Sequence, residues 1–203
     1  MKLFKLAKSS FLIALTLMLS LVFLGTANAE EKEQTKDLSK ANLQELNTTL
    51  DDMTKDVNKQ LKEGKGEAKA IGYFEGEAFE LSFSTNEPLV DNDLIQPMAT
   101  RTKSFSVTLK NTAGFNFSHN LYADWTYNSS NKKISKVSPS SILKGAMYGK
   151  THSTKASKQT NTVYNVHSTG TFKALKVLTE YKTHFHVRVN GTGTHQVVRA
   201  SIG

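Results

Sequence analysis

The sequence predicts a mainly β protein: an antiparallel β-sandwich or small barrel of about six to eight strands in the C-terminal half, preceded by an amphipathic N-terminal helix. Two observations carry this prediction. After residue 100, apolar residues recur at every second position over several stretches, which is the period of a strand with one buried face. Before residue 66, one stretch instead shows the three- and four-residue spacing of a helix.

The first 29 residues have the layout of a secretory signal peptide. Lys2, Lys5 and Lys8 precede an uninterrupted run of apolar or small residues, Phe11 to Leu24, and Ala27-Asn28-Ala29 is a small-x-small cleavage motif. The run is short for a membrane anchor, so we expect cleavage after Ala29 and a secreted, extracellular product, with an uncleaved anchor as the alternative. The Lys-rich start resembles export signals of Gram-positive bacteria, a likeness of export style alone.

The charge is divided unequally along the chain. Residues 30–100 contain 16 acidic and 8 basic residues, a net charge of −8, whereas residues 101–203 contain 15 basic and 2 acidic residues, a net charge of +13. Such asymmetry is typical of a basic region that meets an anionic partner. The acidic segment of the same chain is one such partner, and an anionic surface outside the cell is another.

The acidic segment, residues 30–66, contains the predicted helix. Its apolar residues recur with helical spacing on one face between Leu38 and Leu61: Leu43, Leu46, Leu50, Met53, Val57 and Leu61. Asp37 or Ser39 is suited to cap its start, and Gly64 to follow its end. The apolar face is expected either to pack on the rest of the protein or to self-associate as a short coiled coil.

Residues 67–100 read as a hairpin followed by a linker. Apolar residues alternate around Glu75-Gly76, from Ile71 to Phe83, and the segment 86–100 carries two prolines without a steady period. Together with residues 30–66, this region could serve as an acidic pro-region that covers the basic half and is cut at the linker. The alternative is that residues 30–100 form an integral part of a single domain.

The basic domain, residues 101–203, contains the strongest alternation, with apolar residues at every second position from Phe115 to Tyr127. These residues are expected to form core in a strand bent or bulged midway. Further strands are expected near 105–109, 133–137, 163–169 and 171–178, the last two separated by Gly170. A final hairpin pairs 181–189 with 195–202, and the region 138–161 gives no clear pattern.

The candidate binding residues lie on the polar side of this last hairpin. Lys182, His184, His186 and Arg188 alternate with its apolar residues, and Tyr122 lies on the polar side of the long aromatic strand. His184 and His186 are weak candidates for a metal site with His195, although the flanking cations disfavour a divalent ion. Protonation of these histidines would add positive charge in mildly acidic surroundings.

The chain contains no cysteine, which excludes a disulfide-linked partner and any cysteine-based chemistry. The common catalytic and phosphate-binding motifs are also missing, so no cofactor is expected. These observations favour a secreted, non-catalytic β-domain that binds an anionic cell-envelope polymer or anionic lipid surface, with an antibacterial or effector role as one possibility. The alternative is a secreted hydrolase of wall or polysaccharide substrates, for which Asp124 and Glu180 are the only carboxylates in the basic half.

Overall fold

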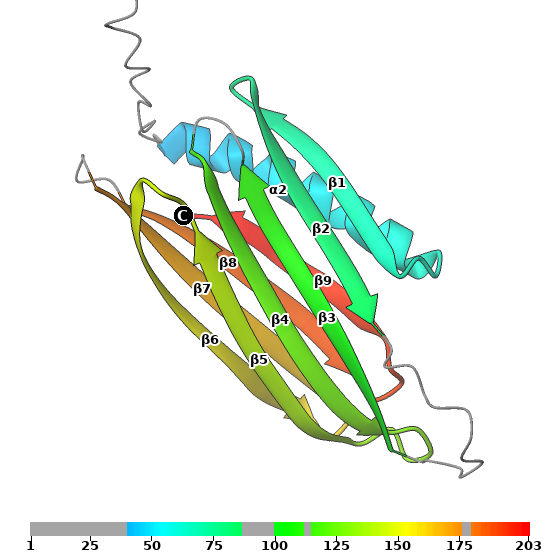
Figure 1. Cartoon of the computed structure of the whole chain (residues 1–203). Coiled ribbons are helices and arrows are strands. Elements are labelled where there is room, and N and C mark those ends of the chain that lie inside the picture. Colours follow the sequence, from blue (N-terminus) through cyan, green and yellow to red (C-terminus); the bar gives the residue numbers. More distant parts are fainter. Residues whose placement is uncertain (1–39, 87–99, 112–114, 176–179) are drawn as a thin grey trace, which may run out of the picture. The chain divides into compact units, whose positions relative to one another are not determined.

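Nine strands and one helix make up the part of the chain that the structure, a computed structural model, describes (Figure 1). This part comprises residues 40–86, 100–111, 115–175 and 180–203. The elements are α2 (Lys40–Lys62), β1 (Glu67–Phe74), β2 (Glu77–Asn86), β3 (Thr100–Asn111), β4 (Phe117–Asn128), β5 (Ile134–Lys144), β6 (Tyr148–Thr160), β7 (Val163–Ala174), β8 (Glu180–Asn190) and β9 (His195–Ile202). The predicted signal peptide and most of the predicted linker lie outside the described residues.

The strands form two antiparallel sheets, one in the order β1-β2-β3-β4-β5 and the other in the order β6-β7-β8-β9. Neighbours within each sheet are consecutive in the sequence, and the chain passes from one sheet to the other between β5 and β6, which lie side by side (Figure 1). Apolar side chains from both sheets share one core. The predicted β-sandwich with a preceding helix is therefore confirmed.

The long aromatic strand β4 shows how the sequence builds this core. Its burial alternates strictly, and Leu121 and Trp125 are fully buried between the sheets. The Trp125 indole Nε1 donates a hydrogen bond to the carbonyl oxygen of Asn190 at 3.3 Å, which ties the two sheets together. The register of β4 against β5 shifts between Thr126 and Tyr127, near the end of the strand and not at its middle as predicted.

The apolar face of helix α2 packs inside its own domain. Leu46, Leu50 and Val57 have no exposed surface, and the helix contacts β1, β2 and β9. Figure 1 shows it beside β1 and β9, the edge strands of the two sheets on that side. Of the two predicted uses of this face, packing on the same domain is the one observed.

Amide side chains of the helix also hydrogen bond to these edge strands. Asn47 accepts from the backbone N–H of Ile202 at 2.9 Å and donates to its carbonyl at 2.7 Å, and Asn58 does the same with Val197 at 3.0 and 2.6 Å. Gln60 pairs in this way with Lys69 of β1. Backbone groups that an edge strand would otherwise leave open are therefore satisfied by the helix.

The spacing of the two asparagines matches that of the strand. Eleven helical residues at about 1.5 Å each span roughly 16.5 Å, and five strand residues at about 3.3 Å span the same distance. Eleven residues are also close to three full turns, so both side chains point to the same side. In a regular strand the backbone groups of residues five apart would turn to opposite edges, but β9 has a register shift between its pairs with His186 and Val187. This irregularity brings the backbone groups of Val197 and Ile202 to the same edge, where Asn58 and Asn47 meet them.

Two regions differ from the sequence prediction. Strand β7 continues through Gly170 without a break. A Cβ at this position would lie 2.6 Å from Leu143 and 2.8 Å from Thr183 Oγ1, so glycine serves close packing and does not mark a turn. The region 138–161 forms most of the two long strands β5 and β6. Most of their side chains are exposed, so they lack the alternation by which a half-buried strand is recognised.

The described part of the acidic half is built into the sandwich. Strand β2 pairs with β3 from Phe79–Asn111 to Asn86–Ser104, so the predicted hairpin is part of the five-stranded sheet. Removal of residues 30–100 would take away the helix and two strands of that sheet.

Candidate binding face

Side chains that point outward from β6, β7, β8 and β9 form one polar surface, which we call the cationic face. Strand register places Lys155 opposite His167, His167 opposite His186, and His186 opposite Arg199, so these four form a row across the sheet. Arg188 lies in the next row, between Asn165 and Gln196. The row joins residues from four strands.

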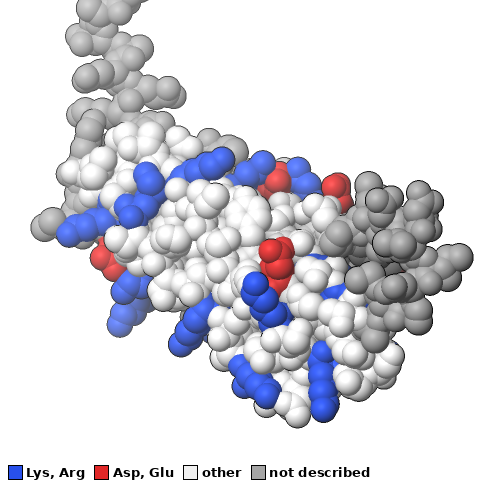
Figure 2. All heavy atoms as spheres, turned by 60° about the horizontal axis from the view of Figure 1, so that its bottom comes forward, with Lys and Arg blue, Asp and Glu red and all other residues white. Residues whose placement is uncertain are grey.

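Positive charge dominates this sheet. Its four strands carry seven Lys or Arg residues and one carboxylate, Glu180. Glu180 pairs with Lys182 at 3.2 Å, whereas none of the carboxylates in the described ranges forms an ion pair with Lys155, Arg188 or Arg199. Figure 2 shows one side of the molecule, where Lys and Arg are spread over the surface with few Asp or Glu among them.

The described part of the acidic half forms few ion pairs with the basic half. Within the part of the chain that is described, Glu80 makes the one ion pair between the two halves, with Lys110 at 3.1 Å, and it also pairs with Lys69. Both lysines lie on the five-stranded sheet. Among the described residues, therefore, no carboxylate of the acidic half forms an ion pair with Lys155, Arg188 or Arg199.

The structure brings together four of the predicted binding residues. Lys182, His184, His186 and Arg188 all project from the outer side of β8, and their inward neighbours are buried. Sequence reasoning missed Lys155 and Arg199, which share this face from other strands. Their position depends on which strands are neighbours and in what register, and alternation within a single strand contains neither fact.

Tyr122 and His195 lie elsewhere. Tyr122 is exposed on the outer side of the five-stranded sheet, the opposite side of the sandwich. His195 lies on the inner side of β9, where its ring stacks on Phe83 with centroids 4.8 Å apart. It cannot join His184 and His186, which point outward, and no group of three potential metal ligands occurs among the residues described.

The histidines of the cationic face act as hydrogen-bonding groups. Burial, followed by the charges of His167 and Arg188, lowers the pKa of His186 to about 4. Burial, followed by Arg199 and Lys182, also lowers the pKa of His184. His186 Nε2 lies 3.0 Å from Asn165 Oδ1. The gain of positive charge expected in mild acid is therefore not supported for His186, and the lowered pKa of His184 disfavours it there too.

A groove of about 600 Å³ crosses one end of this face, beside the start of the helix. His167 and His186 stack along it with ring centroids 4.3 Å apart, and His184, Arg199 and Ser201 also line it. Asn47 borders the groove from the helix.

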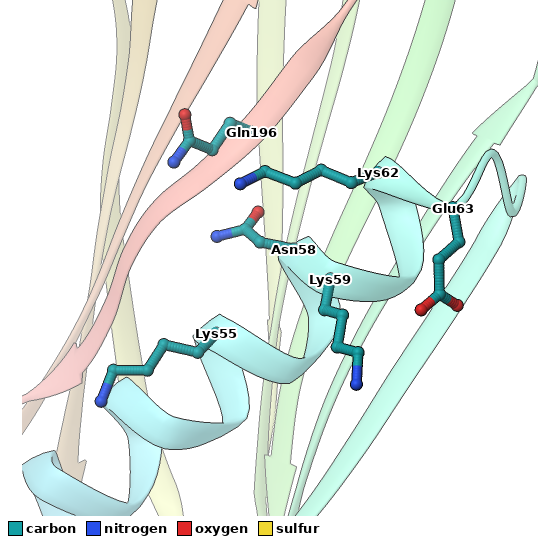
Figure 3. A pocket seen from close by; sticks show the side chains of 6 residues that line it. All are labelled: Lys55, Asn58, Lys59, Lys62, Glu63 and Gln196. Atoms are coloured by element: carbon teal, nitrogen blue, oxygen red, sulfur yellow. The ribbon is translucent and has the colours of Figure 1, made fainter.

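A second hollow lies between the end of α2 and β9 (Figure 3). Lys62 extends over β9 toward Gln196, and Asn58 points to the same side, whereas Lys59 and Glu63 point away. Gln196 is the cross-strand partner of Arg188, so Lys62 continues the cationic face past the edge of the sheet. Lysines at the end of a helix also complement its dipole.

A chain of polar side chains runs through the interior. His119, fully buried, lies 2.8 Å from Thr183 Oγ1 and 2.9 Å from Ser168 Oγ, and Ser168 continues through Thr154 to Ser141. Burial, followed by the charges of His152 and His184, lowers the pKa of His119 to about 3. No carboxylate takes part in these hydrogen bonds between described residues, and the alternation in β4 had marked this position as core.

The two carboxylates of the basic half are held apart. Asp124 lies on the outer side of the five-stranded sheet and accepts a hydrogen bond from Ser104 at 2.6 Å, whereas Glu180 begins β8 of the other sheet. The structure therefore does not join them in one site, as a pair of glycosidase carboxylates would require.

Comparison of the chain with protein-family models, with curated proteins and with solved structures found no match. The helix in the described part of the chain is too polar to cross a membrane.

Proposed function

We propose that this chain is a secreted binding protein whose cationic face binds an anionic polymer of the cell envelope. The proposal includes export by the N-terminal signal with cleavage after Ala29. It assigns binding to Lys155, Arg188 and Arg199, with Lys182 and Lys62 at the borders of the face.

The observation that carries the proposal is the excess of positive charge on the four-stranded sheet, where seven Lys or Arg residues accompany one carboxylate. Lys155 and Arg199 are both exposed, and no described carboxylate pairs with either of them. Charges that are not neutralised within the protein attract an anionic partner over distances of about 10 Å at moderate ionic strength. Their spread over the sheet suits an extended polymer better than a single small anion.

The polarity of the face favours a polymer over a membrane. The outward positions of β6 and β8 are Thr, Ser, Lys, His, Arg and Asn in the stretches Thr151–Ser157 and Lys182–Asn190. Peripheral membrane attachment usually combines cations with several apolar side chains that enter the lipid. These positions offer none, and Val198 of β9 is the single exposed large apolar residue among the described residues of the four strands. Hydroxyl and amide groups instead provide hydrogen bonds to a hydrated chain.

Binding of the mature chain to a purified poly(glycerol phosphate) polymer tests this proposal. Retention is measured on the immobilised polymer and on an uncharged polysaccharide, over salt concentrations from about 20 to 500 mM. We expect retention on the charged polymer alone, weakening steeply as salt increases. Equal retention at both ends of the salt range, or equal retention on the uncharged support, would contradict an electrostatic binding function.

A further inference from the structure

The groove at the end of the cationic face contains several polar atoms that have no partner within the described residues. His184 uses Nδ1 for a contact of 3.1 Å with Thr169 Oγ1, while its Nε2 faces the side of Gly203 without a hydrogen bond. The Ser201 hydroxyl and His186 Nδ1 also make no hydrogen bond with the described part of the chain. Arg199, the cross-strand partner of His186, lines the same groove.

Within the groove, one residue therefore supplies positive charge and others supply neutral hydrogen-bonding groups. Arg199 supplies a positive charge with a planar set of donors, the geometry that suits a phosphate oxygen pair. Burial lowers the pKa of His184 below its ordinary value of 6.5 and that of His186 to about 4, so at pH 7 each imidazole is mainly neutral and presents a donor or an acceptor. Neutral rings and a serine hydroxyl are suited to ligand hydroxyl groups.

We propose that this groove binds one polyol-phosphate unit of a wall polymer, with Arg199 on the phosphate and His184, His186 and Ser201 on the hydroxyl groups of the polyol. This inference rests on the proposed function and adds a substrate class to it. The rest of the cationic face attracts any polyanion, whereas the groove selects anions that carry hydroxyl groups beside the phosphate.

The soluble polymer is the occupant to which the proposal commits. The groove opens on a sheet face whose outward positions on the adjoining β8, from Lys182 to Asn190, are polar, and a chain lying along that face could place one repeat in the groove. A lipid headgroup would have to bring its membrane against the same polar face. Binding to vesicles is therefore an outcome of the test.

The experiment compares two polymers of equal charge per phosphate: poly(glycerol phosphate), which carries hydroxyl groups, and polyphosphate, which carries none. Affinities of the mature chain are measured near pH 6.5 at one salt concentration. We expect at least a tenfold preference for poly(glycerol phosphate). His184→Phe and, as a smaller change, Ser201→Ala are expected to remove most of this preference while affinity for polyphosphate stays within about twofold.

Tyr122→Phe is the matched control, because it removes an exposed hydroxyl from the opposite sheet and keeps the ring. It is expected to keep both affinities. Arg199→Gln is expected to weaken binding of both polymers, since it removes the charge that each would meet. Thermal unfolding of each variant shows whether the fold is kept, and Ser201→Ala decides the matter if His184→Phe does not fold.

Three results would overturn parts of the account separately. Equal affinity of the wild-type chain for the two polymers would contradict selection by the groove and leave the proposed function intact. No binding to either polymer would contradict the proposed function itself. Tighter binding to phosphatidylglycerol vesicles than to the soluble polymer, lost in His184→Phe, would assign the groove to a lipid headgroup and overturn the choice of a wall polymer.

Discussion

Asn58 in helix α2 and Val197 in edge strand β9 are 139 positions apart and are joined by two hydrogen bonds. The amide of Asn58 presents the same donor and acceptor that a neighbouring strand would offer, and Asn47 repeats the arrangement at Ile202. The helix thus acts as a polar cover for an open sheet edge as well as an apolar cover for the core.

Substitution of Asn58 by Ala should destabilise the protein by about 1–3 kcal/mol, because two backbone groups of Val197 lose their partner. Gln44→Ala, on the exposed side of the same helix, should change stability by less than about 0.5 kcal/mol. Chemical denaturation of both variants measures the difference. Equal stabilities of the two variants would show that the edge contacts contribute nothing.

The double variant Asn47→Ala/Asn58→Ala should also associate more readily than the wild type, since it leaves two positions of β9 open to pairing with another chain. Light scattering over a range of protein concentrations measures this association. If the double variant stays monomeric wherever the wild type does, the apolar packing of the helix alone is enough to protect the edge of β9.

Glycine at position 170 should be needed for close packing and not for a turn. Gly170→Ala is expected to cost about 1–3 kcal/mol, because its Cβ would meet Leu143 and Thr183 at less than 3 Å. Gly149→Ala on the neighbouring strand β6 is the control, since its Cβ would have ordinary contacts of 3.8 and 3.9 Å. A similar melting temperature for both variants would contradict this explanation of the unbroken β7.

Stability should fall as the pH is lowered from about 6.5 to about 4. In the folded chain the pKa of His119 is about 3 and that of His195 about 4, mainly through burial, whereas both have an ordinary pKa near 6.5 when unfolded. The unfolded chain therefore binds more protons in this window, so acid favours unfolding. Above pH 5 the carboxylate of Glu80, whose pKa is lowered, stays charged in both states.

Denaturation midpoints between pH 7 and 5 measure this effect, with His119→Gln as the test variant. The wild type should lose stability across this range, and the variant should lose less, even if it starts from a lower value. A wild-type stability that does not change between pH 7 and 5 would contradict neutral, buried histidines.

A cut in the chain between β2 and β3 should not separate the two halves. Residues 79–86 of β2 pair with 104–111 of β3, and Leu46, Leu50 and Val57 are buried in the shared core. A protease site introduced within residues 87–99 tests this expectation. After cleavage, both pieces should elute together in size exclusion under native conditions; release of a free 100–203 fragment would support a separable acidic pro-region.

The sequence predicted the parts of this fold that depend on one-sided burial. The helix, the strand from Phe117 and the last hairpin each show their period directly, because one face meets the core and the other meets water. Strands β5 and β6 gave no such signal, since most of their side chains are exposed. The sheet that β6 begins, and with it the cationic face, was therefore only partly visible.

For the candidate site, too, alternation within one strand predicted some residues and strand pairing decided the others. Lys182, His184, His186 and Arg188 belong to one strand, so alternation alone placed them together. His195 was grouped with them because it follows the turn, but its register opposite Val189 turns it inward. Sequence within one strand cannot predict such a pairing, because a shift of one residue reverses the face of every side chain.

The central claim is that binding depends on where the cations lie and not only on their number. The variant Lys155→Gln/Arg199→Gln removes two charges from the cationic face, and Lys136→Gln/Lys144→Gln removes two from the outer side of the five-stranded sheet. At low salt, the first should weaken binding to poly(glycerol phosphate) by roughly tenfold to thirtyfold, at about 1 kcal/mol for each charge, and the second by less than about threefold. Equal losses in the two variants would contradict a binding site on the four-stranded sheet.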